Sequence, residues 1–312
     1  MTTTAQAGAQ APAASRKART KKPTPTGADR IPKPSQGWYR DPITGDKLRR
    51  VTTILEQGCT KGDALTTWAG NITAETAMEH LPRLVAASRV PEERAEITTW
   101  LKRAHHRKKD ERKDVGTAVH TLIEAHVLGT PVPEELLNDD ELAPFLRHFE
   151  RFVEEWQVDF EASEMVVGHR EHGYAGTLDY LLRSPLVAAA LAARFETDIP
   201  PRSTFMGDTK TGGELDIKGV YPEASLQMSA YRKAEIAWLR DGSTVPMPDT
   251  SWAGVVLHLR PEGYRLIPAV ADDAVFEAFL TVKRNAEWTS GLSKKVIGSA
   301  LTLPTATEER AA

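Results

Sequence analysis

The strongest constraint on the fold is a change of hydrophobic period near residue 157. From Glu141 to Trp156, large apolar residues recur three or four positions apart, which indicates one face of an amphipathic helix. The next stretches, "DFEASEMVVGHREH" and "YAGTLDYLLRS", are typical of two strands joined by a turn at His172-Gly173. A helix of this kind beside such strands predicts the α/β class.

The other predicted elements surround this helix and strand pair. We expect helices over 65–80, 92–110, 114–129, 222–240 and 272–289, with Asp114 capping the third of them. A short strand is expected in "TFMGDTKTG", and "WAGVVLHLR" and "GYRLIPAV" are typical of a hairpin. The segment "LVAAALAARFETDIPPRS" is compatible with a short helix, a loop or an insertion. The expected fold is a mixed central sheet flanked by helices, with an N-terminal helical region.

Composition divides the chain into four expected regions. Residues 1–35 are rich in Ala, Thr, Pro and Gly with a basic cluster, which predicts a disordered tail. This tail either keeps the chain soluble or contacts nucleic acid loosely. The regions expected after it are the helical region at 36–113, a core at 114–291 and a flexible tail at 292–312.

Charge and cysteine content exclude several classes of protein. The net charge of the 312 residues is −3, so a nucleic-acid surface would have to gather its cations locally. The run "KRAHHRKKDERKD" is one such place, although a solvated helix face is its simplest explanation. The one cysteine, Cys59, excludes an internal disulfide and an iron–sulfur cluster. No apolar run reaches the roughly 18 residues of a membrane span, and we expect a cytoplasmic protein.

The stretch "GDTKTGGELDIKG" contains the pattern Asp-x-Lys twice, and one copy is the better candidate for chemistry. Because side chains alternate along a strand, the acid and the lysine of one copy point to the same side. Asp208 and Lys210 follow a strand-like approach and precede two glycines, which allow a ligand to come close. Asp216 and Lys218 lie in a polar segment, for which we predict a surface turn.

Asp179, at the end of "AGTLD", supplies a second acid on a neighbouring predicted strand. Two carboxylates on adjacent strands can hold one divalent cation, and such cations assist the hydrolysis of phosphodiesters. Lys210 would then reach the attacking water or the scissile phosphate while Asp208 binds the cation. The side chain of Thr209 would point away, but its carbonyl oxygen is a candidate for a further ligand.

Four short motifs occur in order along residues 114–240. They are His120 in "GTAVH", Asp179 in "AGTLD", Asp208 and Lys210 in "GDTKTG", and Gln227 and Tyr231 in "QMSAY". Placed on a helix, two strands and a further helix, they resemble the PD-(D/E)XK nuclease superfamily. More narrowly, they resemble its RecB-like branch, which includes CRISPR-associated and phage-encoded exonucleases. The hairpin predicted over 252–270 is similar to one in the phage-encoded members.

The resemblance implies a restriction-endonuclease-like core and a role for each matched residue. His120, Asp179 and Asp208 would bind Mg²⁺ or Mn²⁺, since an imidazole ligand suits manganese. Lys210 would be the catalytic lysine. Taken alone, His120 is also explained as a packed helix residue and Asp179 as a strand-end acid held by backbone amides.

Four further residues are expected near the site. Gln227 and Tyr231, which share a helix face, match a pair that lines the site and the DNA path, but a buried helix edge explains them too. Glu164 matches an acid often present in this branch. Glu124, one turn after His120, either orients the imidazole or is solvated.

These matches imply a metal-dependent DNA exonuclease in recombination or DNA processing, with DNA as its partner. A phage-encoded member would act in the host cytoplasm. The resemblance is also compatible with a recombination partner protein. The oligomeric state is not indicated. Asp179 and Asp208 stand 29 positions apart, which is longer than a compact hairpin and requires an excursion between them. The alternatives are a DNA-binding subunit that keeps the fold without the chemistry, and an endonuclease of the same superfamily.

Overall fold

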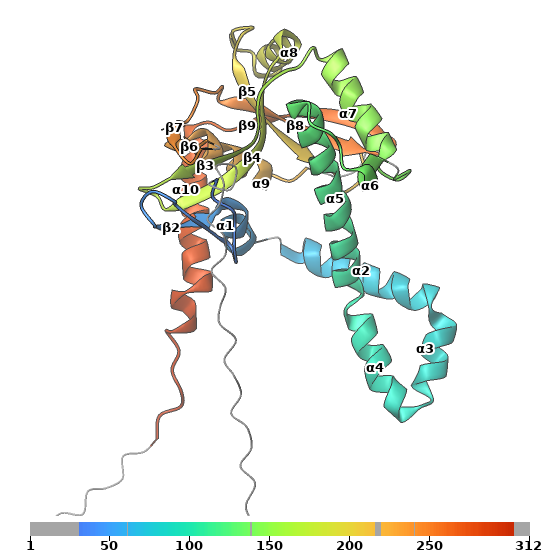
Figure 1. Ribbon diagram of the computed structural model, residues 1–312. Coiled ribbons are helices and arrows are strands. Elements are labelled where there is room, and N and C mark those ends of the chain that lie inside the picture. Colours follow the sequence, from blue (N-terminus) through green and yellow to red (C-terminus); the bar gives the residue numbers. More distant parts are fainter. Residues whose placement is uncertain (1–30, 61, 138, 216–219, 240, 303–312) are drawn as a thin grey trace, which may run out of the picture.

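A computed structural model of the chain describes residues 31–60, 62–137, 139–215, 220–239 and 241–302 (Figure 1). The tail expected at 1–35 therefore lies outside the described residues except for its last five positions. The turn expected at Asp216-Lys218 and the end of the C-terminal tail also lie outside them.

The centre of the molecule is one mixed sheet. In the described ranges its nine strands run in the order β7-β6-β3-β4-β5-β8-β9, with β2 paired to β4 and β1 to β2. Most pairs are antiparallel, but β5–β8 and β2–β4 are parallel. The strands are β1 (Trp38–Arg40), β2 (Lys47–Arg50), β3 (Asp159–His169), β4 (Tyr174–Arg183), β5 (Thr204–Lys210), β6 (Ile236–Trp238), β7 (Thr244–Pro246), β8 (Ala253–Arg260) and β9 (Gly263–Val270).

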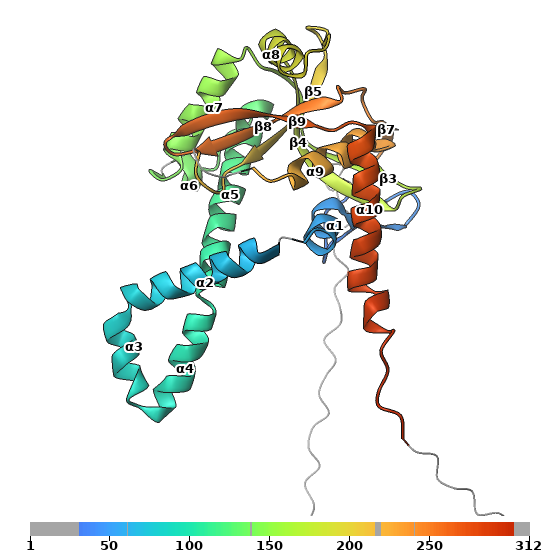
Figure 2. The same ribbon diagram turned by 180° about the vertical axis from the view of Figure 1, so that it is seen from behind.

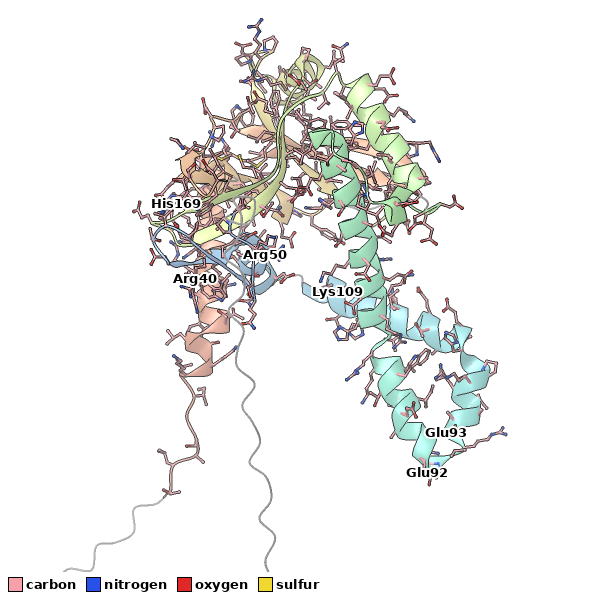
Figure 3. The ribbon with its side chains drawn as sticks, in the orientation of Figure 1. Arg40, Arg50, Glu92, Glu93, Lys109 and His169 are labelled. Atoms are coloured by element: carbon pink, nitrogen blue, oxygen red, sulfur yellow. The ribbon has the colours of Figure 1, made fainter. Side chains whose placement is uncertain are left out.

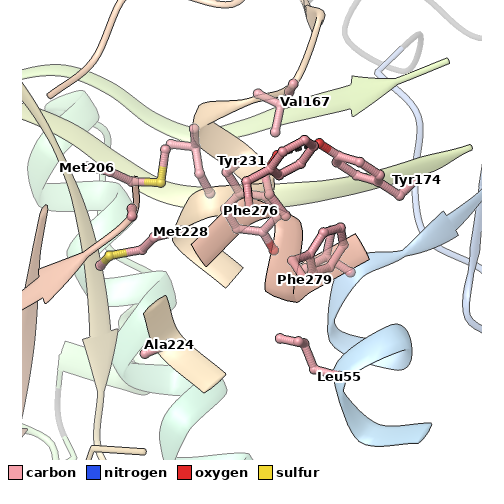
Figure 4. Packing of buried hydrophobic residues seen from close by; sticks show 14 of the residues in the cluster. Leu55, Val167, Tyr174, Met206, Ala224, Met228, Tyr231, Phe276 and Phe279 are labelled. Carbon is pink, nitrogen blue, oxygen red and sulfur yellow. Dashed lines mark hydrogen bonds between the residues drawn. The ribbon is translucent and has the colours of Figure 1, made fainter. Parts of the chain in front are cut away.

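Helices cover both faces of the sheet (Figures 1 and 2). On one side are α5 (Ala104–Leu128), α7 (Ala143–Glu155) and α8 (Pro185–Phe195), whose apolar side chains share one core cluster. On the other are α1 (Val51–Gly58), α9 (Glu223–Arg232) and α10 (Asp273–Ser290), packed around a second cluster rich in aromatic rings (Figure 4). The α/β class and the mixed sheet flanked by helices are thus confirmed.

The predicted helix break before Asp114 is wrong. The helix α5 runs without interruption from Ala104 to Leu128 and ends at Gly129, which adopts a left-handed conformation. Asp114 lies in its interior and caps nothing. The chain turns earlier, at Arg103, between α4 (Pro91–Lys102) and α5. No proline interrupts 104–128, and one internal glycine costs only about 1 kcal/mol, which packing of the second half of the helix offsets.

The helix predicted over 222–240 is too long. It ends at Arg232, and residues 236–238 form β6, which pairs with β3. Trp238 therefore lies on a strand. Its ring packs against Gly168, where a Cβ would lie 2.5 Å from Trp238 Cη2. The segment 186–203, which is compatible with a helix, a loop or an insertion by sequence, contains most of α8. Ser184 caps this helix by accepting a hydrogen bond from Val187 N.

A helical arm projects from the core (Figures 1 and 2). It consists of α2 (Gly62–Glu79), α3 (Leu81–Ser88), α4 and the first half of α5. Strands β1 and β2 come before the arm but belong to the sheet, and residue 113 lies inside α5. The remaining short elements are α6 (Glu134–Leu137) and a 3₁₀ turn, Leu292–Lys294. None of the helices in the described ranges has the length and apolarity to cross a bilayer.

Candidate metal centre

The candidate site lies where two strands separate. Pairing between β4 and β5 ends at Tyr180 and Gly207, and Asp179 and Asp208 are the next residues beyond that pair. At the other end of β4, strand β2 takes the place of β5. Instead of a ladder bond, Thr209 N donates to Asp179 Oδ2 at 2.7 Å. The two aspartates are therefore held at one fork in the sheet.

Three side chains from three elements converge at this fork. His120 on α5, Glu164 on β3 and Asp179 on β4 offer ligand atoms that all lie within 4.8 Å of one another. His120 Nδ1 is 3.6 Å from Asp179 Oδ2 and 3.9 Å from Glu164 Oε1. One imidazole nitrogen and two carboxylate oxygens are a donor set that fits Mn²⁺, and the carboxylates also suit Mg²⁺.

The backbone is strained at Glu164. Its φ of 48° lies in the left-handed region, which costs a non-glycine residue about 1–3 kcal/mol. Glu164 lies between the ladder pairs Ser163–Tyr180 and Met165–Leu178, so it stands opposite Asp179. Leu178 and Tyr180 belong to core clusters on opposite faces, so the alternation of β4 also changes at Asp179. Strained backbone conformations cluster at functional sites.

Asp208 is buried beside the cluster and is paired. Lys210 Nζ lies 2.7 Å from its Oδ1 and 2.6 Å from its Oδ2. Gln227 Nε2 donates to Oδ1 at 3.2 Å. Although Nζ is close, Oδ2 accepts no well-directed hydrogen bond among the described residues. The carboxylate thus keeps an oxygen lone pair for a further ligand while Lys210 balances its charge.

The crowded carboxyl groups shift one another's protonation. Burial, followed by the charges of Asp179 and Glu124, raises the pKa of Glu164 to about 8. Burial also raises the pKa of Asp208, against the opposing effect of Lys210. Burial acts to lower the pKa of Lys210, but Asp208 and Asp179 outweigh it, so the net shift is upward and the ammonium stays charged. A divalent cation at the cluster would relieve this repulsion.

Tyr180 fixes β5 at the fork. A Cβ at Gly207 would lie 1.9 Å from Tyr180 Cε2, so only glycine lets the ring lie against this strand. The Tyr180 hydroxyl is 3.1 Å from Thr209 Oγ1. Thr209 thus bonds Tyr180 through its side chain and Asp179 through its amide. A role for its carbonyl as a metal ligand stays a prediction.

The structure distributes the expected site residues in two groups. His120, Asp179 and Glu164 form the candidate cluster, whereas Asp208 is held by Lys210 and Gln227. The Tyr231 ring packs against β4 at Gly176, where a Cβ would lie 2.3 Å from Tyr231 Cε1. Glu124 lies close enough to Glu164 to raise its pKa. The sequence predicts His120, Asp179, Asp208 and Thr209 as metal ligands and Glu164 only as a residue near the site, whereas the cluster consists of His120, Asp179 and Glu164.

Two residues near the site, Tyr39 and Arg50, were not anticipated from the sequence. Tyr39 OH lies 2.9 Å from Thr177 Oγ1, and burial raises its pKa, with a further contribution from Glu164 and an opposing one from Arg50. Both residues come from "GWYRDPITGDKLRRV", which indicates the start of ordered structure but has no clear period. The pairing of β1 with β2 and of β2 with β4 brings both residues next to β4.

Comparison with known proteins does not add to this picture. No protein-family model matches the chain, and no curated protein shows significant sequence similarity to it.

Proposed function

We propose that the protein is a metal-dependent deoxyribonuclease that degrades DNA from its ends. The observation that carries the proposal is the convergence of His120, Glu164 and Asp179 within 4.8 Å, next to the ion pair of the buried Asp208 with the half-buried Lys210. The order of these motifs resembles that of PD-(D/E)XK exonucleases, and this resemblance is the basis for choosing DNA ends and for placing the reaction in recombination or DNA processing in a cytoplasm.

The residues suit phosphodiester hydrolysis. A bound Mg²⁺ or Mn²⁺ supplies hydroxide at neutral pH and neutralises phosphate oxygens. His120, Glu164 and Asp179 would hold it, with Asp208 reaching it through its remaining oxygen lone pair. The Lys210 side chain is 35% exposed, so its ammonium can turn from Asp208 to a phosphate oxygen and stabilise the charge that develops there. Gln227 would keep Asp208 in place meanwhile.

Digestion of end-labelled DNA tests this proposal. Linear single- and double-stranded DNA, labelled at the 5′ or the 3′ end, is incubated with Mg²⁺, with Mn²⁺ and with EDTA. We expect degradation by the wild type with either metal and none with EDTA. Lys210→Ala should lower the rate by about 100-fold or more, because a charge that stabilises the transition state is removed. The label retained longest gives the polarity.

Matched controls separate the proposal from its alternatives. Lys283→Ala removes a lysine that is ion-paired with Glu287 on α10, and it should keep the wild-type rate. Circular single-stranded DNA should stay intact, and cleavage of it would identify an endonuclease instead. A wild type that binds DNA but leaves it uncut with both metals would be a non-catalytic binding subunit.

A further inference from the structure

A hollow of about 620 Å³ opens beside α5, apart from the metal centre. It lies where the end of α1, the helix α2, the first half of α5 and the start of α9 meet. Its walls include Leu65, Trp68, Lys109, Arg112, Tyr221 and Leu226. Figure 3 shows Lys109 where α5 leaves the core, far from Glu92 and Glu93 at the tip of the arm.

The walls combine aromatic rings with cations. The Arg112 guanidinium carbon lies 5.9 Å from the centre of the Trp68 ring. Tyr221 is 54% exposed and Leu65 is 50% exposed. Lys109 and Arg112 are exposed as well, and Glu223 is the acidic residue in the lining. Aromatic faces beside cations bind the bases and phosphates of an unpaired nucleic-acid strand.

The hollow connects to the metal centre through two helices. On α5, Arg112 precedes His120 by eight residues, which is about 12 Å along the helix axis. Between them, Gly116 passes close to the residue that follows β5, since a Cβ there would lie 3.3 Å from Thr211 Oγ1. On α9, Leu226 in the wall adjoins Gln227, which contacts Asp208. A strand held in the hollow would therefore lie within a few nucleotides of the cluster.

We propose that this hollow binds unpaired nucleotides of single-stranded DNA, which makes the single strand the preferred substrate of the proposed nuclease. Bases stack on Trp68 and Tyr221, while Lys109 and Arg112 contact the phosphates. A duplex cannot fill the site in this way, because its bases are already stacked on each other. The substrate preference rests on the proposed function, whereas binding in the hollow is tested independently of cleavage.

Fluorescence anisotropy with a labelled oligothymidylate, in EDTA, measures binding without any metal-dependent chemistry. Trp68→Ala should weaken binding by roughly tenfold, and Trp68→Phe should retain most of it, because stacking needs a ring. Tyr221→Ala, at an exposed position, should also weaken binding. Trp288→Ala removes a tryptophan that is 47% exposed on α10, and it should leave the affinity unchanged. A labelled duplex should bind more weakly than the single strand.

The outcomes distinguish this inference from the proposed function. Unchanged single-strand affinity in folded Trp68→Ala and Tyr221→Ala would overturn the inference even if the wild type digests DNA. Loss of affinity in both variants would uphold binding in the hollow even if the wild type cuts nothing. A wild type that binds the duplex as tightly as the single strand, or binds no single strand at all, would also overturn it.

Discussion

The two halves of α5 have different surroundings although they form one continuous helix. Residues 104–113 carry most of the basic run and are largely exposed. In 115–128, Val119, Leu122 and Ile123 are buried in the core cluster that contains Phe149. His120 lies in the second half but on another side, towards Glu164 and Asp179. The first half thus presents cations to the proposed DNA strand, whereas the second half packs against the core and contributes His120 to the candidate cluster.

This difference shows how a single helix can couple a binding surface to a metal site. Because the second half is packed, the axial position of the first half relative to the fork is set by helix geometry. Substitutions in the two halves should then affect different measurements: folding and metal binding for the second half, and DNA affinity for the first.

The largest expected effect is on stability. Leu122→Ala deletes a side chain that is 2% exposed, and it should lower the free energy of unfolding by about 2–5 kcal/mol. Lys109→Ala in the exposed half should change it by no more than about 0.5 kcal/mol. Urea denaturation followed by circular dichroism measures both values. Equal effects would mean that the first half is packed as well.

His120→Ala should have the next largest effect. Removing one of three converging candidate ligands should weaken Mn²⁺ binding by about 100-fold, as judged from the 10–100-fold losses caused by outer-shell changes. His106→Ala removes an exposed histidine of the basic half, residues 104–113, and it should leave Mn²⁺ binding unchanged. Isothermal titration calorimetry compares the two variants. Wild-type Mn²⁺ affinity in His120→Ala would remove this histidine from the candidate cluster.

Glu164 should give stability a defined pH dependence when EDTA keeps metal ions away. Burial raises the pKa of its carboxyl to about 8 in the folded protein, against 4.5 in the unfolded chain. Between these values the folded state holds the extra proton, so stability falls as pH rises. Glu164→Gln, which cannot ionise, should flatten this fall and leave the protein more stable than the wild type at pH 8. Thermal melts at pH 5 and pH 8 provide the measurement, and an unchanged slope would contradict the prediction.

The smallest effect is expected from single cations of the basic half. Lys109→Ala should reduce the salt dependence of single-strand binding by about 0.7 in the slope of log affinity against log salt, because one phosphate contact is lost. Lys294→Ala, on the 3₁₀ turn after α10, should not change this slope. Anisotropy titrations at several salt concentrations compare the two. An identical slope for both variants would place the DNA elsewhere.

Local patterns determined many of the elements of this protein. The helix at 143–155, the strands β3 and β4, the hairpin of β8 and β9 and the helix α10 agree with their predictions, because each has a clear period or turn signal. The candidate residues of the site could also be identified, since His120, Asp179, Asp208 and Lys210 stand in short, ordered motifs. Periodicity reports which residues share a face, and motifs report which groups can bind or donate.

Tertiary structure alone decided which of these groups meet. Glu164 stands opposite Asp179 because of the β3–β4 register, while Asp208 turns to Lys210 and Gln227. The chain ends α9 early because residues 236–238 gain partners in β3, and it carries α5 through Asp114 because the second half of the helix packs on the sheet. Such choices depend on contacts between residues far apart in the chain, and a local hydrophobic period contains no information about them.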